Sequence, residues 1–182
     1  MAGRGGSETD CAAREIEAKA SLNELLSKEL DMVIGALDIA HILQKSSNVG
    51  ISKLALSLSP ESFLGCYQQL GFGQLVGVRF PGESPGRLLG SGKLRPFEQA
   101  TLSFGYGLSV SALQLAQAYT ALANEGEMLR ARLIRDEYIE PAVRVMSADT
   151  ARTVRQMLEQ VVSREGTALK AAVRGFRVSG KT

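Results

Sequence analysis

Apolar residues recur at helical spacing in several segments of the chain, and helix-start and helix-stop residues bound most of these segments. The pattern predicts helices over residues 11–34, 36–57, 60–70, 111–124 and 148–165. Ser59-Pro60 and Ser147 supply N-terminal caps, and Gly71, Gly126 and Gly166 supply stops. The poor helix formers of Ser46-Ser47-Asn48 predict a break or tight turn near residues 44–48.

The predicted packing faces come from the same spacing. In 111–124 the face comprises Leu113, Ala116, Ala118, Ala121 and Leu122, and Phe63, Tyr67 and Tyr119 are also expected in the core. His41 is expected at a helix surface or in the core rather than as a catalytic base, and Tyr106 either in the core or along a cleft.

The segments between the helices are rich in glycine. Residues 71–92 hold seven glycines and two prolines in 22 positions, which predicts a long irregular connection with a function or an unrecognised structure. Residues 97–103 are expected as a short helix or extended piece, 104–107 as a glycine turn, 132–145 as a weak hairpin and 175–182 as a strand-like run. The fold class predicted is mixed α/β and rich in helices.

Charge and composition exclude several functions. A net charge of +2 over 182 residues, without a Lys/Arg-rich run, gives no electrostatic footprint for nucleic acid. Two cysteines and one histidine cannot build a zinc site, so no metal and no cofactor is expected. Because Cys11 lies in a polar leader, Cys11 and Cys66 are expected as free thiols, with a disulfide as the alternative.

No membrane segment is predicted. Residues 1–10 are polar and glycine-rich, which predicts a disordered leader without the apolar core of a signal peptide. The longest uncharged stretch, 99–124, has the length of a membrane span but carries too many polar side chains for a bilayer core.

Two short motifs carry candidate chemistry. Ser46-Ser47-Asn48 places a hydroxyl and a carboxamide on a predicted turn, and Lys181-Thr182 places an ammonium and a hydroxyl on a predicted strand. Either motif alone is common turn, cap or surface material. Together and in this order they match the second and third elements of the S-x-x-K, S-D-N and K-T-G set of serine acyl-transfer enzymes.

Longer stretches then indicate a family. They are Ile42-Leu-Gln-Lys-Ser-Ser-Asn-Val-Gly-Ile-Ser-Lys-Leu-Ala55, Tyr67-Gln-Gln-Leu-Gly-Phe-Gly73, Phe80-Pro-Gly-Glu-Ser84, Glu98-Gln-Ala-Thr-Leu-Ser-Phe-Gly-Tyr-Gly-Leu108, Leu113-Gln-Leu-Ala-Gln-Ala-Tyr119 and Val178-Ser-Gly-Lys-Thr182. Over residues 35–182 the chain resembles the transpeptidase domain of class B penicillin-binding proteins, and most closely the septal cell-division transpeptidase of Gram-negative bacteria. A serine β-lactamase shares the fold, but Phe104-Gly-Tyr-Gly107 and the layout of residues 46 to 182 fit the transpeptidases better.

The resemblance implies a D,D-transpeptidase that cross-links peptidoglycan stem peptides through a serine acyl-enzyme and is a target of β-lactams. It implies that Ser46 is the proton-relay hydroxyl and that Asn48 bonds the backbone amide of the substrate. It also implies that Lys181 supplies positive potential at the catalytic centre and, with Thr182, grips the terminal carboxylate. The implied partners are the D-Ala-D-Ala stem peptide, β-lactams and divisome proteins, at the periplasmic face of the bacterial inner membrane.

The chain departs from the family pattern at the nucleophile. No serine is followed by a lysine three positions later, and we recognise no motif of the family in residues 1–34. We therefore predict a leader or helix of uncertain origin over 1–34 and a partial transpeptidase domain over 35–182. Because the chain stops at Thr182, before the glycine of K-T-G, we expect an incomplete antiparallel sheet and no activity of the chain alone. The alternative is a non-catalytic module that binds peptides or acts as a scaffold, and a generic helical interaction domain would need all these motifs to be coincidental.

Overall fold

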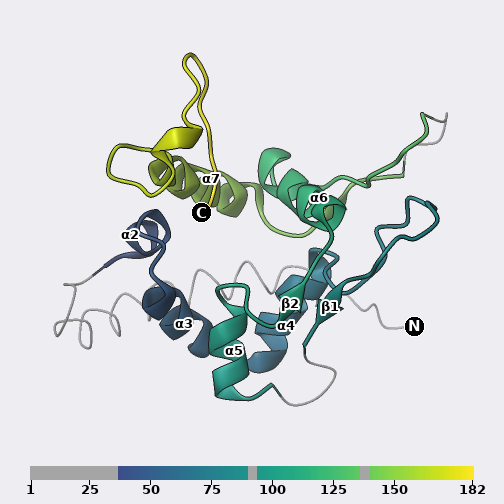
Figure 1. Cartoon of the computed structure of the whole chain (residues 1–182), viewed down its shortest axis with the longest axis horizontal. Helices are drawn as coiled ribbons and strands as arrows, with labels where there is room; N and C mark the ends of the chain where they lie inside the picture. Colours follow the sequence, from purple (N-terminus) through teal and green to yellow (C-terminus); the bar gives the residue numbers. More distant parts are fainter. Residues whose placement is uncertain (1–36, 90–93, 136–139) are drawn as a thin grey trace, which may run out of the picture.

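The computed structural model describes residues 37–89, 94–135 and 140–182, so the predicted leader and first helix over 1–34 lie outside the described residues. Figure 1 shows α6 and α7 on one side of the molecule and α3, α4 and α5 on the other, with α2 beside α7. The elements are α2 (Ile39–Gln44), α3 (Asn48–Leu56), α4 (Pro60–Gln69), β1 (Arg87–Leu88), α5 (Pro96–Leu102), β2 (Leu108–Ser109), α6 (Ala112–Ala123), β3 (Glu127–Met128), β4 (Val143–Arg144), α7 (Ala148–Val161) and a short 3₁₀ turn, η1 (Leu169–Ala171).

The helices begin where the sequence provides caps. The side chains of Ser59, Ser111 and Ser147 each accept a hydrogen bond from the backbone N–H three residues later. The predicted break near 44–48 is confirmed, because α2 ends at Gln44 and α3 begins at Asn48. The predicted stop at Gly126 is also confirmed, with φ of 89° and no room for a Cβ atom beside the Met146 carbonyl.

Helix α6 differs from its predicted packing face. Gln114 and Gln117 are buried, whereas Leu113 is half-buried and Tyr119 is 41% exposed. The Gln114 amide donates to the carbonyls of Gln74 (2.7 Å) and Pro85 (2.9 Å). The Gln117 side-chain oxygen accepts from the Ala131 N–H at 2.9 Å. Both amides are buried because they pair with backbone groups, which a hydrophobic pattern does not register.

The strands are short. β1 pairs with β2 and β3 pairs with β4, both antiparallel, and these are the sheets of the described residues. A hairpin was predicted over 132–145. The second strand of the β3–β4 pair lies in that range, but the first strand lies before it. Residues 175–182 form no strand, so the strand-like expectation was wrong; the segment runs along α7 instead.

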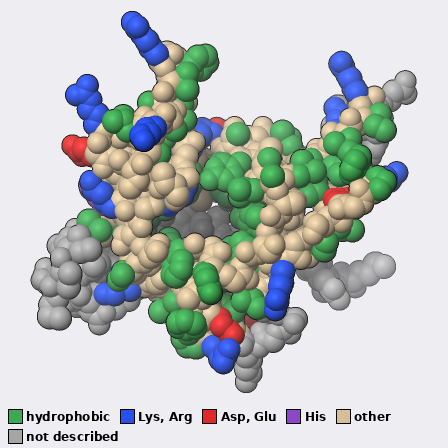
Figure 2. Space-filling model, viewed as in Figure 1, with side chains coloured by type: hydrophobic (Ala, Val, Ile, Leu, Met, Phe, Trp, Pro, Cys, Tyr) green, Lys and Arg blue, Asp and Glu red, His purple; other side chains and the backbone are tan. Residues whose placement is uncertain are grey.

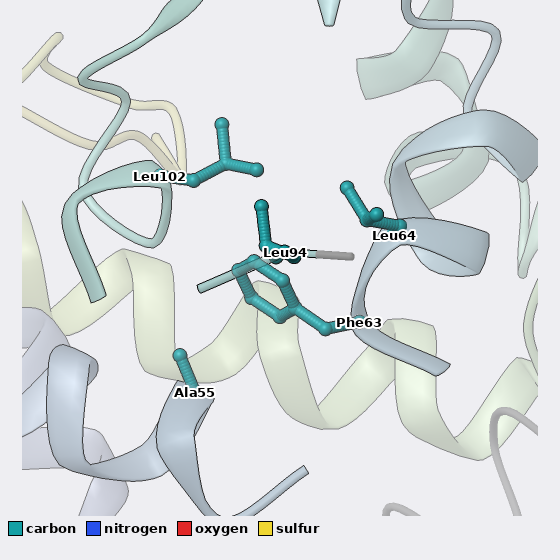
Figure 3. Close-up of a cluster of buried hydrophobic side chains, with 5 residues drawn as sticks. All are labelled: Ala55, Phe63, Leu64, Leu94 and Leu102. Carbon is teal, nitrogen blue, oxygen red and sulfur yellow. The ribbon is translucent and has the colours of Figure 1, made fainter. Parts of the chain in front are cut away.

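The main hydrophobic cluster lies between α3, α4 and α5. Figure 3 shows the side chains of Ala55, Phe63, Leu64, Leu94 and Leu102 directed toward one another. Tyr67 packs against this cluster, with its ring edge-on to Phe63 at 5.2 Å between centroids, and its hydroxyl donates to the Leu102 carbonyl at 3.0 Å. The prediction that Phe63 lies in the core is confirmed.

Cys66 corrects another expectation. This residue of α4 is disulfide-bonded, whereas a free thiol was predicted from the polar composition around the other cysteine. Local polarity does not determine which residues come together in the fold, so it was a poor guide here. The expectation for Cys11 lies outside the described residues.

Candidate functional site

The first half of the site is the turn between α2 and α3. After the cap residue Lys45, Ser46 adopts a left-handed conformation with φ of 55°. The Ser46 N–H donates to the Leu43 carbonyl and the Ser47 N–H donates to the Ile42 carbonyl, at 3.1 and 3.0 Å. These two bonds form a Schellman motif, which reverses the chain sharply and leaves Ser46 at its apex.

The same turn starts α3. The Ser47 hydroxyl accepts a hydrogen bond from the Gly50 N–H at 3.1 Å, so Ser47 is the helix cap and Asn48 is the first helical residue. A Cβ atom on Gly50 would come within 2.7 Å of the buried Ile42 side chain. Glycine therefore lets α3 approach α2 closely, and this approach fixes Asn48 relative to Ser46.

The second half of the site is the segment 179–182, which lies along α7. The Ser179 hydroxyl donates to the Arg155 carbonyl at 3.1 Å, and the Gly180 N–H donates to the Leu158 carbonyl at 3.3 Å. Figure 1 shows the end of the chain beside α7. These bonds hold the segment in one register, which determines where Lys181 and Thr182 point.

The two halves meet although 135 residues separate them in the sequence. The Lys181 ammonium donates a hydrogen bond to the Ser46 hydroxyl, and a second bond to the Thr182 carbonyl at 2.6 Å. The hydroxyl oxygens of Ser46 and Thr182 lie 3.2 Å apart, and that of Thr182 lies 2.7 Å from the Thr167 hydroxyl. An ammonium and three hydroxyls thus form one connected network.

A cavity of about 360 Å³ opens at this network. Its walls include Ser46, Asn48, Lys181 and Thr182 together with Ile42, Leu43, Ser47, Ile51, Ser103, Phe104, Tyr119 and Leu158. Figure 2 shows this face of the molecule hollowed between its two sides. Apolar walls around a few polar groups are typical of a small-ligand site.

The electrostatics of the cavity centre on Lys181. Partial burial lowers the pKa of its ammonium from the ordinary value of 10.5, because desolvation disfavours the charged form. A lysine with a lowered pKa exchanges its proton more readily, and its bond to Ser46 gives that proton a path to a hydroxyl. The arrangement can therefore bind a carboxylate and relay a proton.

The structure brings together all four residues named from the sequence: Ser46, Asn48, Lys181 and Thr182. Sequence reasoning missed Thr167, which precedes the motif by 14 residues and carries no signal of its own. Tyr119, expected in the core, is exposed and lines the cavity instead.

Two other residues that were considered lie apart from this chemistry. His41 is exposed and its ring nitrogen Nδ1 lies 2.7 Å from the Asp38 carboxylate, at the start of α2. Tyr106 is 71% exposed in the glycine turn, so it does not belong to the core. That turn is confirmed by φ values of 88° at Gly105 and 84° at Gly107.

The described ranges contain no cluster of three or more His, Cys, Asp or Glu side chains able to hold a metal ion. The polar groups at the cavity are hydroxyls, a carboxamide and an ammonium, which suit an anionic peptide terminus.

The S-x-N turn and the Lys-Thr segment correspond to the second and third motifs of the serine acyl-transfer enzymes, and in this fold the two lie together at one cavity. The family described as the penicillin binding protein transpeptidase domain matches residues 6–182, and the chain belongs to this family. The predicted resemblance to the transpeptidase domain of class B penicillin-binding proteins is thereby confirmed.

Curated relatives agree with this assignment. The chain is 43% identical over 150 residues to a probable peptidoglycan D,D-transpeptidase PenA of Neisseria flavescens, and 36% identical over 146 residues to the peptidoglycan D,D-transpeptidase FtsI of Escherichia coli K12. These alignments cover 82% and 80% of the chain, but 38% and 25% of the relatives. The chain thus spans well under half the length of these relatives.

Solved structures show the same fold. The transpeptidase domain of penicillin-binding protein 3 from Burkholderia pseudomallei is 47% identical with a TM-score of 0.76, over 81% of this chain and 45% of that one. Penicillin-binding protein 3 from Mycobacterium tuberculosis, solved in complex with ampicillin, is 35% identical with a TM-score of 0.75, over 80% of this chain and 36% of that one. The predicted mixed, helix-rich fold of this family is confirmed.

Proposed function

We propose that this chain supplies the relay and carboxylate-binding part of a peptidoglycan D,D-transpeptidase site. In this proposal Ser46 relays a proton, Asn48 bonds the peptide backbone of the substrate, and Lys181 and Thr182 bind the terminal carboxylate of D-Ala-D-Ala. The observation that carries the proposal is the hydrogen bond from Lys181 to Ser46, because it joins two motifs from distant parts of the chain at one cavity. The names of the PenA and FtsI relatives support the reaction class.

The proposed chemistry is acyl transfer through a serine ester. A serine hydroxyl attacks the carbonyl carbon of the D-Ala-D-Ala peptide bond, its proton passes through the relay to the departing amine, and D-alanine leaves. A second amine then attacks the ester, and the serine regains its proton. The sequence holds no S-x-x-K serine, so we propose that the chain binds the peptide without forming the acyl-enzyme on its own.

A peptide titration tests the binding. Isothermal calorimetry of the full chain with N-acetylated L-Lys-D-Ala-D-Ala is expected to show saturable binding, and the L-Ala-L-Ala diastereomer is expected to bind at least tenfold more weakly. Lys181→Met is expected to abolish binding, because the carboxylate then loses its cation. Equal affinity for both diastereomers would contradict the proposal.

A β-lactam incubation tests the chemistry separately. Intact mass spectrometry after incubation with ampicillin is expected to show no covalent adduct, with the chain folded by circular dichroism. An adduct mapped by peptide digestion to one serine would show that a nucleophile operates outside the S-x-x-K pattern, and the non-acylating proposal would then be wrong.

The second candidate function is a peptide-binding or scaffold module of the same fold, favoured by the intact cavity without the nucleophile motif. It predicts D-Ala-D-Ala binding by the chain and no acylation even in a longer protein that includes an S-x-x-K segment. Acylation of a longer protein that includes an S-x-x-K segment would favour the transpeptidase.

Location and partners follow the family resemblance. Among the described residues no helix is long and apolar enough to cross a membrane. We propose that the parent protein acts at the periplasmic face of the inner membrane with divisome proteins, and that β-lactams bind the same cavity. The ampicillin complex of the Mycobacterium tuberculosis relative supports the last point.

A further inference from the structure

Helix α7 contacts both halves of the site through carbonyl groups in its C-terminal half. The last four carbonyls of an α-helix have no partner within the helix. In α7 the carbonyl of Leu158 accepts from the Gly180 N–H, and the carbonyl of Gln160 accepts from the Gln44 side chain at 3.5 Å. The two motifs therefore attach to neighbouring positions of one helix end.

The attachment of the first half runs through Gln44, the last residue of α2. Its side chain is 6% exposed, and its amide nitrogen also lies 3.4 Å from the Ser163 hydroxyl. The ammonium of the next residue, Lys45, donates to the Glu165 carbonyl at 2.8 Å. Because Ser46 follows directly, these bonds fix the apex of the turn relative to the end of α7.

The attachment of the second half runs through Ser179, whose hydroxyl donates to the Arg155 carbonyl. Arg155 is itself fixed, because its guanidinium donates to the Leu122 carbonyl at 2.8 Å and to the Glu125 carboxylate at 2.9 Å, at the end of α6. Two residues beyond Ser179, the Lys181 ammonium reaches Ser46.

We propose that Gln44 and Ser179 are positioning residues that use α7 as a common support to hold Ser46 against Lys181. Neither side chain lines the cavity, so each acts through its neighbours rather than on a ligand. Arg155 and Gln160 are five steps apart in α7, or about 7.5 Å along the helix axis, which sets the separation of the two attachments. The inference deepens the proposed function and rests on it for the substrate.

The first test loosens each attachment while keeping the cavity residues. Ser179→Ala removes a hydroxyl, and Ser179→Thr keeps it as the matched control. Gln44→Met keeps the length of the side chain and removes its donors. Ser179→Ala loses one hydrogen bond and Gln44→Met loses two long ones, and each variant is expected to bind N-acetylated L-Lys-D-Ala-D-Ala about three- to tenfold more weakly. Ser179→Thr is expected to keep wild-type affinity.

The second readout separates positioning from stability. The pKa of Lys181, followed by NMR of its side-chain carbons and assigned with Lys181→Arg, is expected to rise toward the ordinary lysine value in Ser179→Ala and Gln44→Met, because a loosened ammonium is better solvated. Thermal unfolding by circular dichroism shows that each variant folds. A purely structural role would lower the unfolding temperature and leave the pKa unchanged.

A double variant completes the test. If both residues fix the same contact, the combined affinity loss of Gln44→Met with Ser179→Ala is expected to be smaller than the product of the single losses. Folded single variants with wild-type pKa and affinity would overturn the proposal. If the wild-type chain binds no dipeptide, the proposed function fails, while the Lys181 pKa still decides whether Gln44 and Ser179 position the ammonium.

Discussion

Gln99 joins α5 to the end of α3, and its replacement should expose the contribution of buried amides to this fold. Its side chain is 3% exposed, and the amide donates to the carbonyls of Ala55 at 2.7 Å and Leu58 at 3.0 Å. The Ala55 carbonyl is one of the last four of α3, so it depends on partners outside the regular helix pattern.

Gln99→Met keeps the length of the side chain and removes both donors. An unsatisfied buried acceptor costs about 1–3 kcal/mol. In this variant the Ala55 carbonyl still accepts from the Leu58 N–H at 3.1 Å, so it loses only one of its hydrogen bonds. The Leu58 carbonyl loses its hydrogen bond from the Gln99 amide. We expect the free energy of unfolding to fall by about 2–3 kcal/mol.

Urea denaturation followed by circular dichroism measures this change. With a slope of about 2 kcal/mol per molar urea, the midpoint is expected to fall by about 1–1.5 M. Gln69→Met at an exposed position of α4 is the matched control, with an expected change within about 0.5 kcal/mol. A midpoint for Gln99→Met equal to that of the control would refute the reasoning, because the two amide bonds would then contribute nothing.

Three further changes test the packing, the turn and the charges. Phe63→Ala is expected to lower the free energy of unfolding by about 3–5 kcal/mol, since it empties the cluster between α3, α4 and α5, and urea denaturation measures the loss. Ser47→Ala removes the cap of α3 at a cost of about 1 kcal/mol, and calorimetry should show weaker dipeptide binding as Asn48 loosens. The Arg155 guanidinium bonded to Glu125 lowers the pKa of that carboxyl below 4.5, so its stabilisation is present above pH 4.5 and is lost as the pH falls through the folded pKa. Glu125→Gln should therefore flatten the acid side of the stability profile measured by thermal unfolding at pH 2–7, and an unchanged profile would contradict the pairing.

Local chemistry predicted most helix starts and stops, because caps and stops act within one turn of the chain. The exception is α7, which ends at Val161, whereas the sequence predicted a helix to residue 165 with Gly166 as its stop. Ser59, Ser147 and Gly126 mark boundaries where the sequence placed them. The segment 175–182 was predicted as a strand-like run, but whether a strand forms depends on a neighbouring strand, and here the segment lies on a helix.

The candidate site was less accessible to local reasoning. The turn at Ser46 could be predicted from poor helix formers. Its contact with Lys181 joins residues 135 positions apart, and only the match to a known motif set and the family resemblance pointed to both. The proposed positioning residues Gln44 and Ser179 were missed because the sequence does not show whether a polar side chain is buried or exposed. Their importance appears only when their partners on α7 are seen.

The left-handed backbone at Ser46 implies a trade-off between stability and the role proposed for the Ser46 hydroxyl. Glycine adopts this conformation without the steric penalty of a Cβ atom, which is about 1 kcal/mol or more for other residues. A glycine at this apex would therefore relax the turn and make the chain more stable, but it would remove the hydroxyl that meets Lys181. Selection for thermal stability alone would favour glycine, so a serine at this position is what the proposed role of its hydroxyl requires.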